Sequence, residues 1–171
     1  MKKIERPFWG IIFPCVIFFS LIFGYFSGYR INLTDSLPYY VFRIIPLQPD
    51  EEIKHNDYVF FKPTLISHDV IPVAIERTYI NHRHPMVKKV VGLPGDMIIL
   101  KDERLFINNT STPLFILRED SQNRPLSPYL TPLILDEDFY WLSSDPERGF
   151  DSRYFGPLHR SFFTHRAFPI F

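Results

Sequence analysis

Two lysines, Lys88 and Lys89, lie inside a short apolar stretch that reads MVKKVVGLPGD over residues 86–96. A lysine that points into an apolar core loses hydration, which disfavours the ammonium and lowers its pKa. A neutral amine can then accept a proton from a nearby hydroxyl. Strand alternation does not choose between the two lysines, because both faces carry apolar neighbours. The alternative is a surface strand with two solvated lysines, since most lysines are solvated.

A candidate hydroxyl occurs in the segment INLTDSLP, residues 31–38. Taken alone, Thr34, Asp35 and Ser36 are typical of a turn or a helix cap. A serine is a weak nucleophile until a base takes its proton. Lysine can be that base if its pKa falls by roughly 2–3 units, which corresponds to about 3–4 kcal/mol between protonation states. Burial against apolar groups such as Met86 and Val90 is the expected cause.

A third polar group occurs near the C-terminus, in FDSRYFGP over residues 150–157. Asp151 and Arg153 are two residues apart and share a face if the stretch is extended. By itself this pair predicts only a surface ion pair, which contributes little to stability.

The composition restricts the class of protein. The chain has 171 residues with 19 positive and 19 negative side chains, so no nucleic-acid partner is indicated. The single cysteine, Cys15, excludes an intrachain disulfide and a cysteine metal cluster. We expect no metal and no cofactor. The 16 prolines and many aromatic residues favour short strands and loops over a helical bundle.

Residues 7–29 carry no charge and are long enough to cross a hydrocarbon core of roughly 30 Å. Lys2, Lys3 and Arg6 precede this segment, which predicts a cytoplasmic N-terminus with the remaining chain outside the cytoplasm. A cleaved signal peptide is the alternative, but no pair of small residues marks a cleavage site. We therefore expect an anchor over residues 1–30 and a β-rich domain over residues 31–171.

The pattern after the anchor indicates a mainly β domain. Strands are expected over residues 39–45, 57–62, 86–91 and 139–142, with a turn at 92–96. Residues 97–101 and 104–108 predict a hairpin with Asp102 and Glu103 at its turn. Residues 109–132 are interpreted as a long loop, and residues 158–171 as a basic, aromatic tail on the domain or the membrane.

An anchor, Thr34-x-Ser36-x-Pro38, Lys88 in VKKVVGLPGD and DSRYFGP stand in this order along the chain. Together they resemble the type I signal peptidase family of serine peptidases, which use a Ser–Lys dyad, and within it the TraF-type peptidases of conjugative transfer systems. The resemblance covers roughly residues 32–158. It implies a small signal-peptidase-like β-barrel or pair of sheets preceded by one transmembrane helix.

The resemblance implies a role for each matching residue. Ser36 is the expected nucleophile and Lys88 the general base, because the family's lysine stands four residues before the Gly of GLPGD. The Thr34 hydroxyl and the Ser36 backbone N–H are expected to bind the oxyanion. Asp151 and Arg153 are expected to support the lysine's surroundings. An extended substrate is expected to add as a strand beside Met86 and Val87 and along Leu33 to Asp35.

One position departs from the family pattern. Many members have a serine two residues before the Asp, where it orients the lysine, and this chain has Gly149 there. Ser143, Ser144 or a water molecule are the candidate substitutes.

The expected function is removal of a leader peptide from a membrane-tethered precursor, a conjugative pilin in the TraF branch. The alternatives are a general signal peptidase, a pilin cyclase that transfers the acyl group to an amine, and a non-catalytic component of a secretion channel. The expected location is the bacterial inner membrane, with the lipid bilayer as a partner and the catalytic domain on the periplasmic side.

Overall fold

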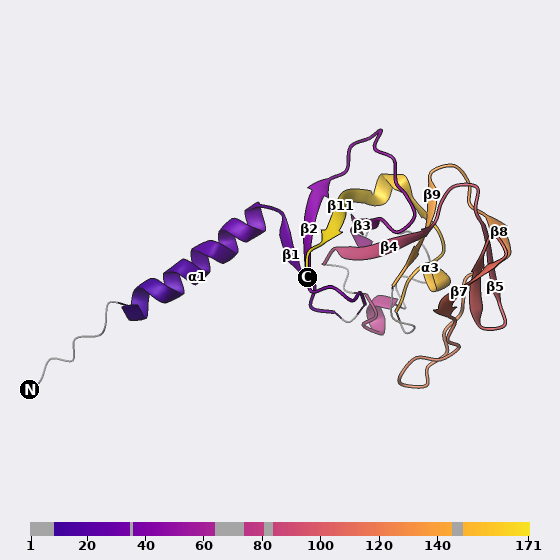
Figure 1. Cartoon of the computed structure of the whole chain (residues 1–171). Coiled ribbons are helices and arrows are strands. Elements are labelled where there is room, and N and C mark those ends of the chain that lie inside the picture. The colour runs from indigo at the N-terminus through magenta and orange to yellow at the C-terminus, as the bar shows by residue number, and fades with distance from the viewer. Residues whose placement is uncertain (1–8, 35, 64–73, 81–83, 145–148) are drawn as a thin grey trace, which may run out of the picture.

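A computed structural model describes residues 9–34, 36–63, 74–80, 84–144 and 149–171. The described strands form a seven-stranded sheet in the order β1-β2-β11-β3-β4-β9-β10 and a four-stranded sheet in the order β7-β6-β5-β8. Figure 1 shows the two sheets side by side, with one helix standing away from them. The prediction of a mainly β domain is confirmed. Two alternatives were predicted, a barrel or a pair of sheets, and the described strands form two sheets that do not close into a barrel.

The larger sheet gathers strands from both ends of the chain. Its members are β1 (Tyr29–Ile31), β2 (Val41–Pro46), β3 (Tyr58–Phe61), β4 (Met86–Gly92), β9 (Phe139–Ser143), β10 (Leu158–His159) and β11 (Phe163–Pro169). All of its neighbouring strands are antiparallel. Asp151 caps the N-terminus of a short helix, α3 (Ser152–Phe155), and a 3-10 turn, η2 (Arg160–Phe162), leads into β11. The two faces of this sheet pack against separate apolar clusters, because alternate residues of β3 belong to different ones.

The smaller sheet contains the predicted hairpin. Its strands are β5 (Met97–Lys101), β6 (Arg104–Ile107), β7 (Thr110–Phe115) and β8 (Leu133–Ile134). Asp102 and Glu103 both have positive φ, 48° and 59°, as a tight two-residue hairpin turn requires. The turn over 92–96 is also confirmed: Gly95 has φ +88°, and the Asp96 carboxylate accepts from the Leu93 N–H at 2.7 Å.

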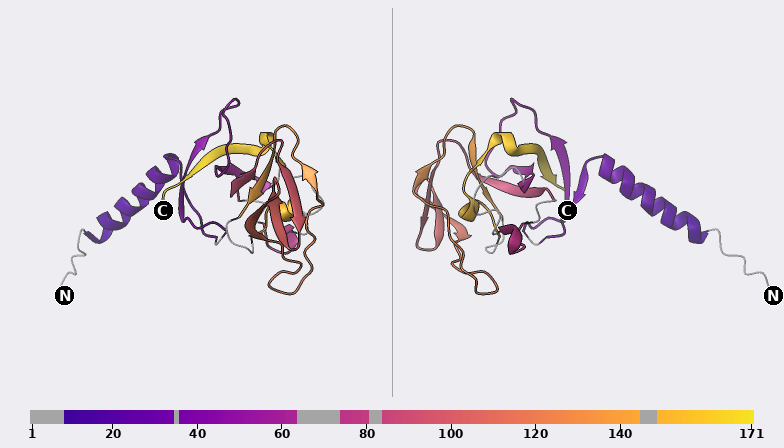
Figure 2. Two further views of the ribbon diagram at one scale, coloured as in Figure 1. Left: turned by 45° about the vertical axis from the view of Figure 1, so that its right-hand side comes forward. Right: turned by 180° about the vertical axis from the view of Figure 1, so that it is seen from behind.

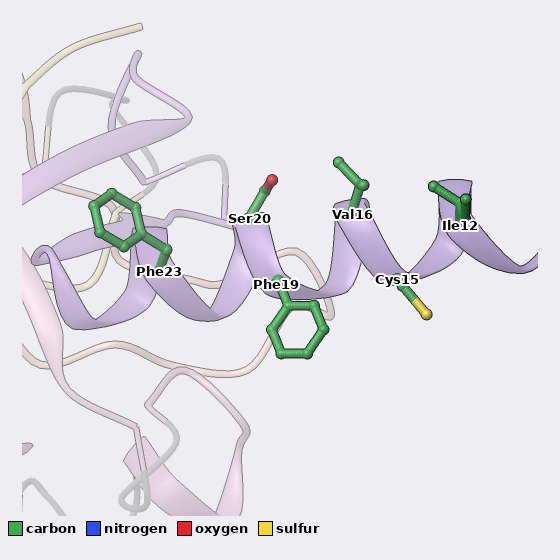
Figure 3. A pocket seen from close by; sticks show the side chains of 6 residues that line it. All are labelled: Ile12, Cys15, Val16, Phe19, Ser20 and Phe23. Carbon is green, nitrogen blue, oxygen red and sulfur yellow. The ribbon is translucent and has the colours of Figure 1, made fainter.

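The N-terminal helix α1 (Trp9–Phe26) projects from the β-sheets, and two further views show the same separation (Figure 2). Its outward side chains line a shallow hollow along the helix itself (Figure 3), formed by Ile12, Cys15, Val16, Phe19, Ser20 and Phe23. Within the described part of the chain, no helix combines the length and the apolarity that a membrane crossing needs.

Two segments differ from the sequence-based expectation. Residues 109–132 are not a continuous loop, because β7 pairs with β6 at their start and β8 follows them closely. The C-terminal tail supplies β11, which lies in the interior of the larger sheet between β2 and β3. Charged residues interrupt the hydrophobic alternation of β11, and its two partner strands are distant in sequence, so local patterning did not reveal it.

Candidate active site

Strand β4 directs Lys88 into the protein interior. Lys88 is 2% exposed and lies opposite Val59 of β3, which is fully buried. Val90, two residues further along β4, is also buried on the same face. Lys89 lies opposite Tyr58, so its side chain belongs to the other face of the sheet and is half-buried. The structure therefore makes the choice that strand alternation left open, and Lys88 is the lysine within the core.

The Lys88 ammonium group has a specific hydrogen-bond partner. Its Nζ donates to the Oγ of Ser144, which is itself fully buried at the end of β9. The pKa of Lys88 is lowered from 10.5 to about 8. Burial is the main cause of this shift; the nearby Asp151 carboxylate opposes it by raising the pKa, and the Arg153 guanidinium adds to it by lowering the pKa. Of the two candidate serines for the place left by Gly149, Ser144 is therefore the one that contacts the lysine.

Asp151 and Arg153 form a buried ion pair behind Ser144. Both side chains are 0% exposed, and two guanidinium nitrogens of Arg153 donate to the carboxylate at 2.7 and 2.8 Å. The carboxylate also accepts from the Ser144 backbone N–H at 2.7 Å. The surface ion pair that the sequence alone favoured is therefore wrong, because the short helix α3 turns both side chains inward.

This pairing matters for the charge on Lys88. An unpaired carboxylate near the amine would stabilise the ammonium and raise its pKa. The adjacent guanidinium opposes that effect, and burial remains the largest influence on the pKa of the amine. Arg153 also donates to the Gly149 carbonyl at 2.9 Å and to the Phe115 carbonyl, which ties the smaller sheet to this region.

Ser36 lies in a small hydrogen-bonded group with Thr34 and Asn32. The Thr34 hydroxyl donates to the Asn32 side-chain oxygen at 2.7 Å, and the oxygens of Thr34 and Ser36 are 2.8 Å apart. A hydroxyl has one proton, so Ser36 is the donor to Thr34 in this arrangement. Asn32 is fixed in turn by its side-chain amide, which donates to the Tyr39 carbonyl at 3.0 Å.

A single cavity of about 1050 Å³ connects the two polar groups. Ser36 and Lys88 both line it, and no hydrogen bond between them occurs among those described. Every described residue expected to bind substrate or the oxyanion also lines this cavity, namely Leu33, Thr34, Met86 and Val87. Asp35 lies outside the described residues. The hollow along α1 includes none of these residues.

The sequence did not identify several other residues of the cavity wall. Asn32 accepts a hydrogen bond from Thr34, close to the predicted nucleophile. The sequence indicates this role only by the polar character of Asn32 and its place two residues before Thr34. Tyr79 and Phe150 also line the cavity. Their aromatic side chains are unremarkable in a chain with 18 Phe and 9 Tyr, so only the fold distinguishes them.

The family model for signal peptidase, peptidase S26, matches residues 6–171. The chain belongs to the S26 signal peptidase family. The resemblance inferred from the sequence is therefore confirmed, and the match extends through the C-terminal β11 as well as the region of the motifs.

Several proteins similar to this chain are named for conjugal or plasmid transfer. A conjugal transfer protein TraF from Agrobacterium fabrum is 27% identical over 89% of this chain and 87% of its own length. A TraF from Agrobacterium tumefaciens is 32% identical over 85% of this chain and 83% of its own. A plasmid transfer protein TraF from Escherichia coli is 28% identical over 81% and 79%. A crystal structure of a signal peptidase I from Enterococcus faecalis matches at 22% identity with a TM-score of 0.40, covering 68% of this chain and 97% of its own.

Proposed function

We propose that this chain is a serine endopeptidase in which Ser36 is the nucleophile and the uncharged amine of Lys88 is its general base. The observation that carries the proposal is a lysine 2% exposed, with its pKa lowered to about 8 by burial, lining the same cavity as Ser36. Near neutral pH an ordinary lysine is almost entirely protonated, whereas a pKa of about 8 leaves roughly a tenth of this amine neutral at pH 7. Membership of the S26 family supports the same chemistry.

The proposed reaction follows from these positions. Lys88 Nζ takes the Ser36 proton as Oγ attacks the substrate carbonyl, and the oxyanion is bound by the Ser36 N–H and the Thr34 hydroxyl. For this, the Thr34 proton turns from Asn32 toward the oxyanion. The Lys88 ammonium then protonates the leaving amine, and a second round with water releases the acyl group from Ser36.

The proposed substrate is the precursor of an exported protein, with a conjugative pilin as the specific case. The likeness to conjugal and plasmid transfer proteins supports this proposed substrate class. We further propose that the uncharged residues 7–29 hold the protein at the bacterial inner membrane, with residues 31–171 on the periplasmic side. That part of the proposal rests on the sequence, because the basic residues precede the uncharged segment.

The proposal is tested by incubating the purified full chain with candidate conjugative pilin precursors, followed by intact-mass analysis. Hydrolysis yields the precursor without its leader. Cyclisation yields a ring that is one water lighter than the linear chain with the same residues. Ser36→Ala should yield neither product, because no alcohol remains to form the acyl-enzyme. Ser111→Ala is the matched control, since Ser111 is an exposed serine on β7. An unprocessed precursor with the unmodified protein would favour the non-catalytic assembly role.

Replacing Ser144 tests how the lysine is oriented. We expect Ser144→Ala to reduce the cleavage rate about 10²-fold, because the buried amine loses the hydroxyl that fixes its direction. Ser143→Ala is the control: that hydroxyl is also buried, but it donates to the Ser144 carbonyl and should be largely dispensable. Equal losses in the two variants would contradict the specific role of Ser144.

A further inference from the structure

Tyr79 forms part of an aromatic wall on the proposed active-site cavity. Its ring stacks on Phe150 with centroids 5.3 Å apart and planes at 29°. Phe150 stacks in turn on Tyr154 at 5.4 Å and 8°, and both Tyr79 and Phe150 line the cavity that contains Ser36 and Lys88. Aromatic rings in such a stack have little freedom to move, so this side of the cavity has a fixed shape.

A carboxylate from a distant part of the chain holds the Tyr79 ring in place. The Tyr79 hydroxyl donates to Asp120, 41 residues further along the chain. The Arg124 Nε donates to the same carboxylate at 2.6 Å, and its guanidinium lies over the Tyr79 ring at 5.5 Å. The Asp120 side chain is only 7% exposed. The tyrosine is thus fixed by a charge-assisted hydrogen bond at one end and by ring stacking on Phe150.

The segment that carries Asp120 is itself firmly attached. The other Asp120 oxygen accepts from the backbone N–H groups of Gln122 and Arg124 at 2.8 and 2.9 Å, which closes a tight turn. Arg77, two residues before Tyr79, donates from its guanidinium to the Pro125 carbonyl at 2.7 Å. The segment between β7 and β8 therefore holds Tyr79, and with it one wall of the cavity, in position through these hydrogen bonds.

We propose that Tyr79 is a specificity-determining residue, and that Asp120 is its positioning residue. This inference rests on the proposed peptidase function. The fixed ring limits the size of the substrate side chain that packs against it in the cavity lined by Ser36 and Lys88, so removal of the ring should admit larger side chains. A rigid pocket wall discriminates by a factor of about 10–200 for each additional methylene group.

The test is cleavage of a defined mixture of synthetic peptides by the purified full chain, with each cut bond identified by mass spectrometry. For Tyr79→Ala we expect the rate at bonds flanked by Leu or Phe to rise at least about tenfold relative to bonds flanked by Ala. Tyr79→Phe and Asp120→Ala keep the ring but remove the tether, and a smaller change in the same direction is expected. Asp120→Asn keeps a hydrogen-bond acceptor and should remain closer to the unmodified profile.

Matched controls separate the wall from general effects of truncation. Tyr40 is an exposed tyrosine and Asp50 an exposed aspartate, and neither lines the cavity. Tyr40→Ala and Asp50→Ala should therefore leave the residue profile unchanged. The midpoint of the pH profile should also stay constant in all variants, because none of them changes the proposed Ser36–Lys88 pair.

The outcomes distinguish this inference from the proposed function. An unchanged residue profile in active Tyr79→Ala, or a loss of thermal stability alone, overturns the role of Tyr79 and leaves the peptidase proposal intact. If Tyr79→Ala does not fold, Tyr79→Phe and Asp120→Ala decide the matter in the same assay. No cleavage of precursor or peptides by the unmodified protein overturns the proposed function, and this inference with it.

Discussion

Replacing Lys88 with arginine is expected to reduce precursor cleavage by on the order of 10³-fold or more, because a guanidinium stays protonated and cannot accept the serine proton. Lys88→Met is expected to be equally inactive. Methionine has nearly the same length and carries no charge, so it should fill the buried site without loss of stability. Cleavage is measured on the pilin precursor, and folding by thermal unfolding of each variant.

Lys89→Arg is the matched control, since Lys89 is the next residue on the same strand and faces the other side of the sheet. It should retain most of the activity. Normal cleavage by Lys88→Met would reject Lys88 as the base, and an inactive Lys89→Arg beside an active Lys88→Arg would move the role to the neighbouring lysine.

The second large effect is expected on stability. Arg153→Ala removes the partner of a fully buried carboxylate and leaves Asp151 without its guanidinium. Breaking such a pair typically costs about 3–5 kcal/mol, which corresponds to a fall in Tm of roughly 6–20 °C for a chain of this size. The unpaired carboxylate would also raise the pKa of Lys88, so any remaining activity should require a higher pH.

Lys54→Ala is the control for the ion pair. The Lys54–Glu52 pair is exposed, with side chains 67% and 78% accessible, and its loss should change the free energy of unfolding by less than about 1 kcal/mol. If Arg153→Ala unfolds at the same temperature as Lys54→Ala, the pair does not support the site. A stable Arg153→Ala with an unshifted pH profile would remove its electrostatic role as well.

Much of the site could be predicted from the sequence because the informative residues are local. VKKVVGLPGD combines a strand with a turn, and β4 and the turn after it follow this pattern. The Asp102–Glu103 hairpin was equally readable, since its turn residues tolerate positive φ. The family resemblance then distinguished Lys88 from Lys89, which agrees with the burial of Lys88 on the core face of β4.

The remaining features depend on contacts between distant parts of the chain. The burial of Asp151 and Arg153 follows from a four-residue helix that the extended interpretation of DSRYFGP did not include. Ser144 could not be separated from Ser143 until the register of β9 against β4 was known. The Tyr79–Asp120 contact joins two segments that each resemble an ordinary loop in sequence. Such long-range pairings are decided by tertiary packing, which local propensity does not encode.

Titration of the buried Lys88 amine is the most direct test of the proposed mechanism, because the mechanism requires that amine to be uncharged. In protein labelled with ¹³C at lysine Cε, the Lys88 signal is assigned by its absence in Lys88→Met and followed with pH. We expect a midpoint near 8, because burial holds the pKa of Lys88 well below the ordinary lysine value of 10.5. Since the neutral amine is the active form, kcat/KM should rise through the same pH. A Lys88 signal that titrates at the ordinary lysine value of 10.5 would contradict the proposed role of Lys88 as the base.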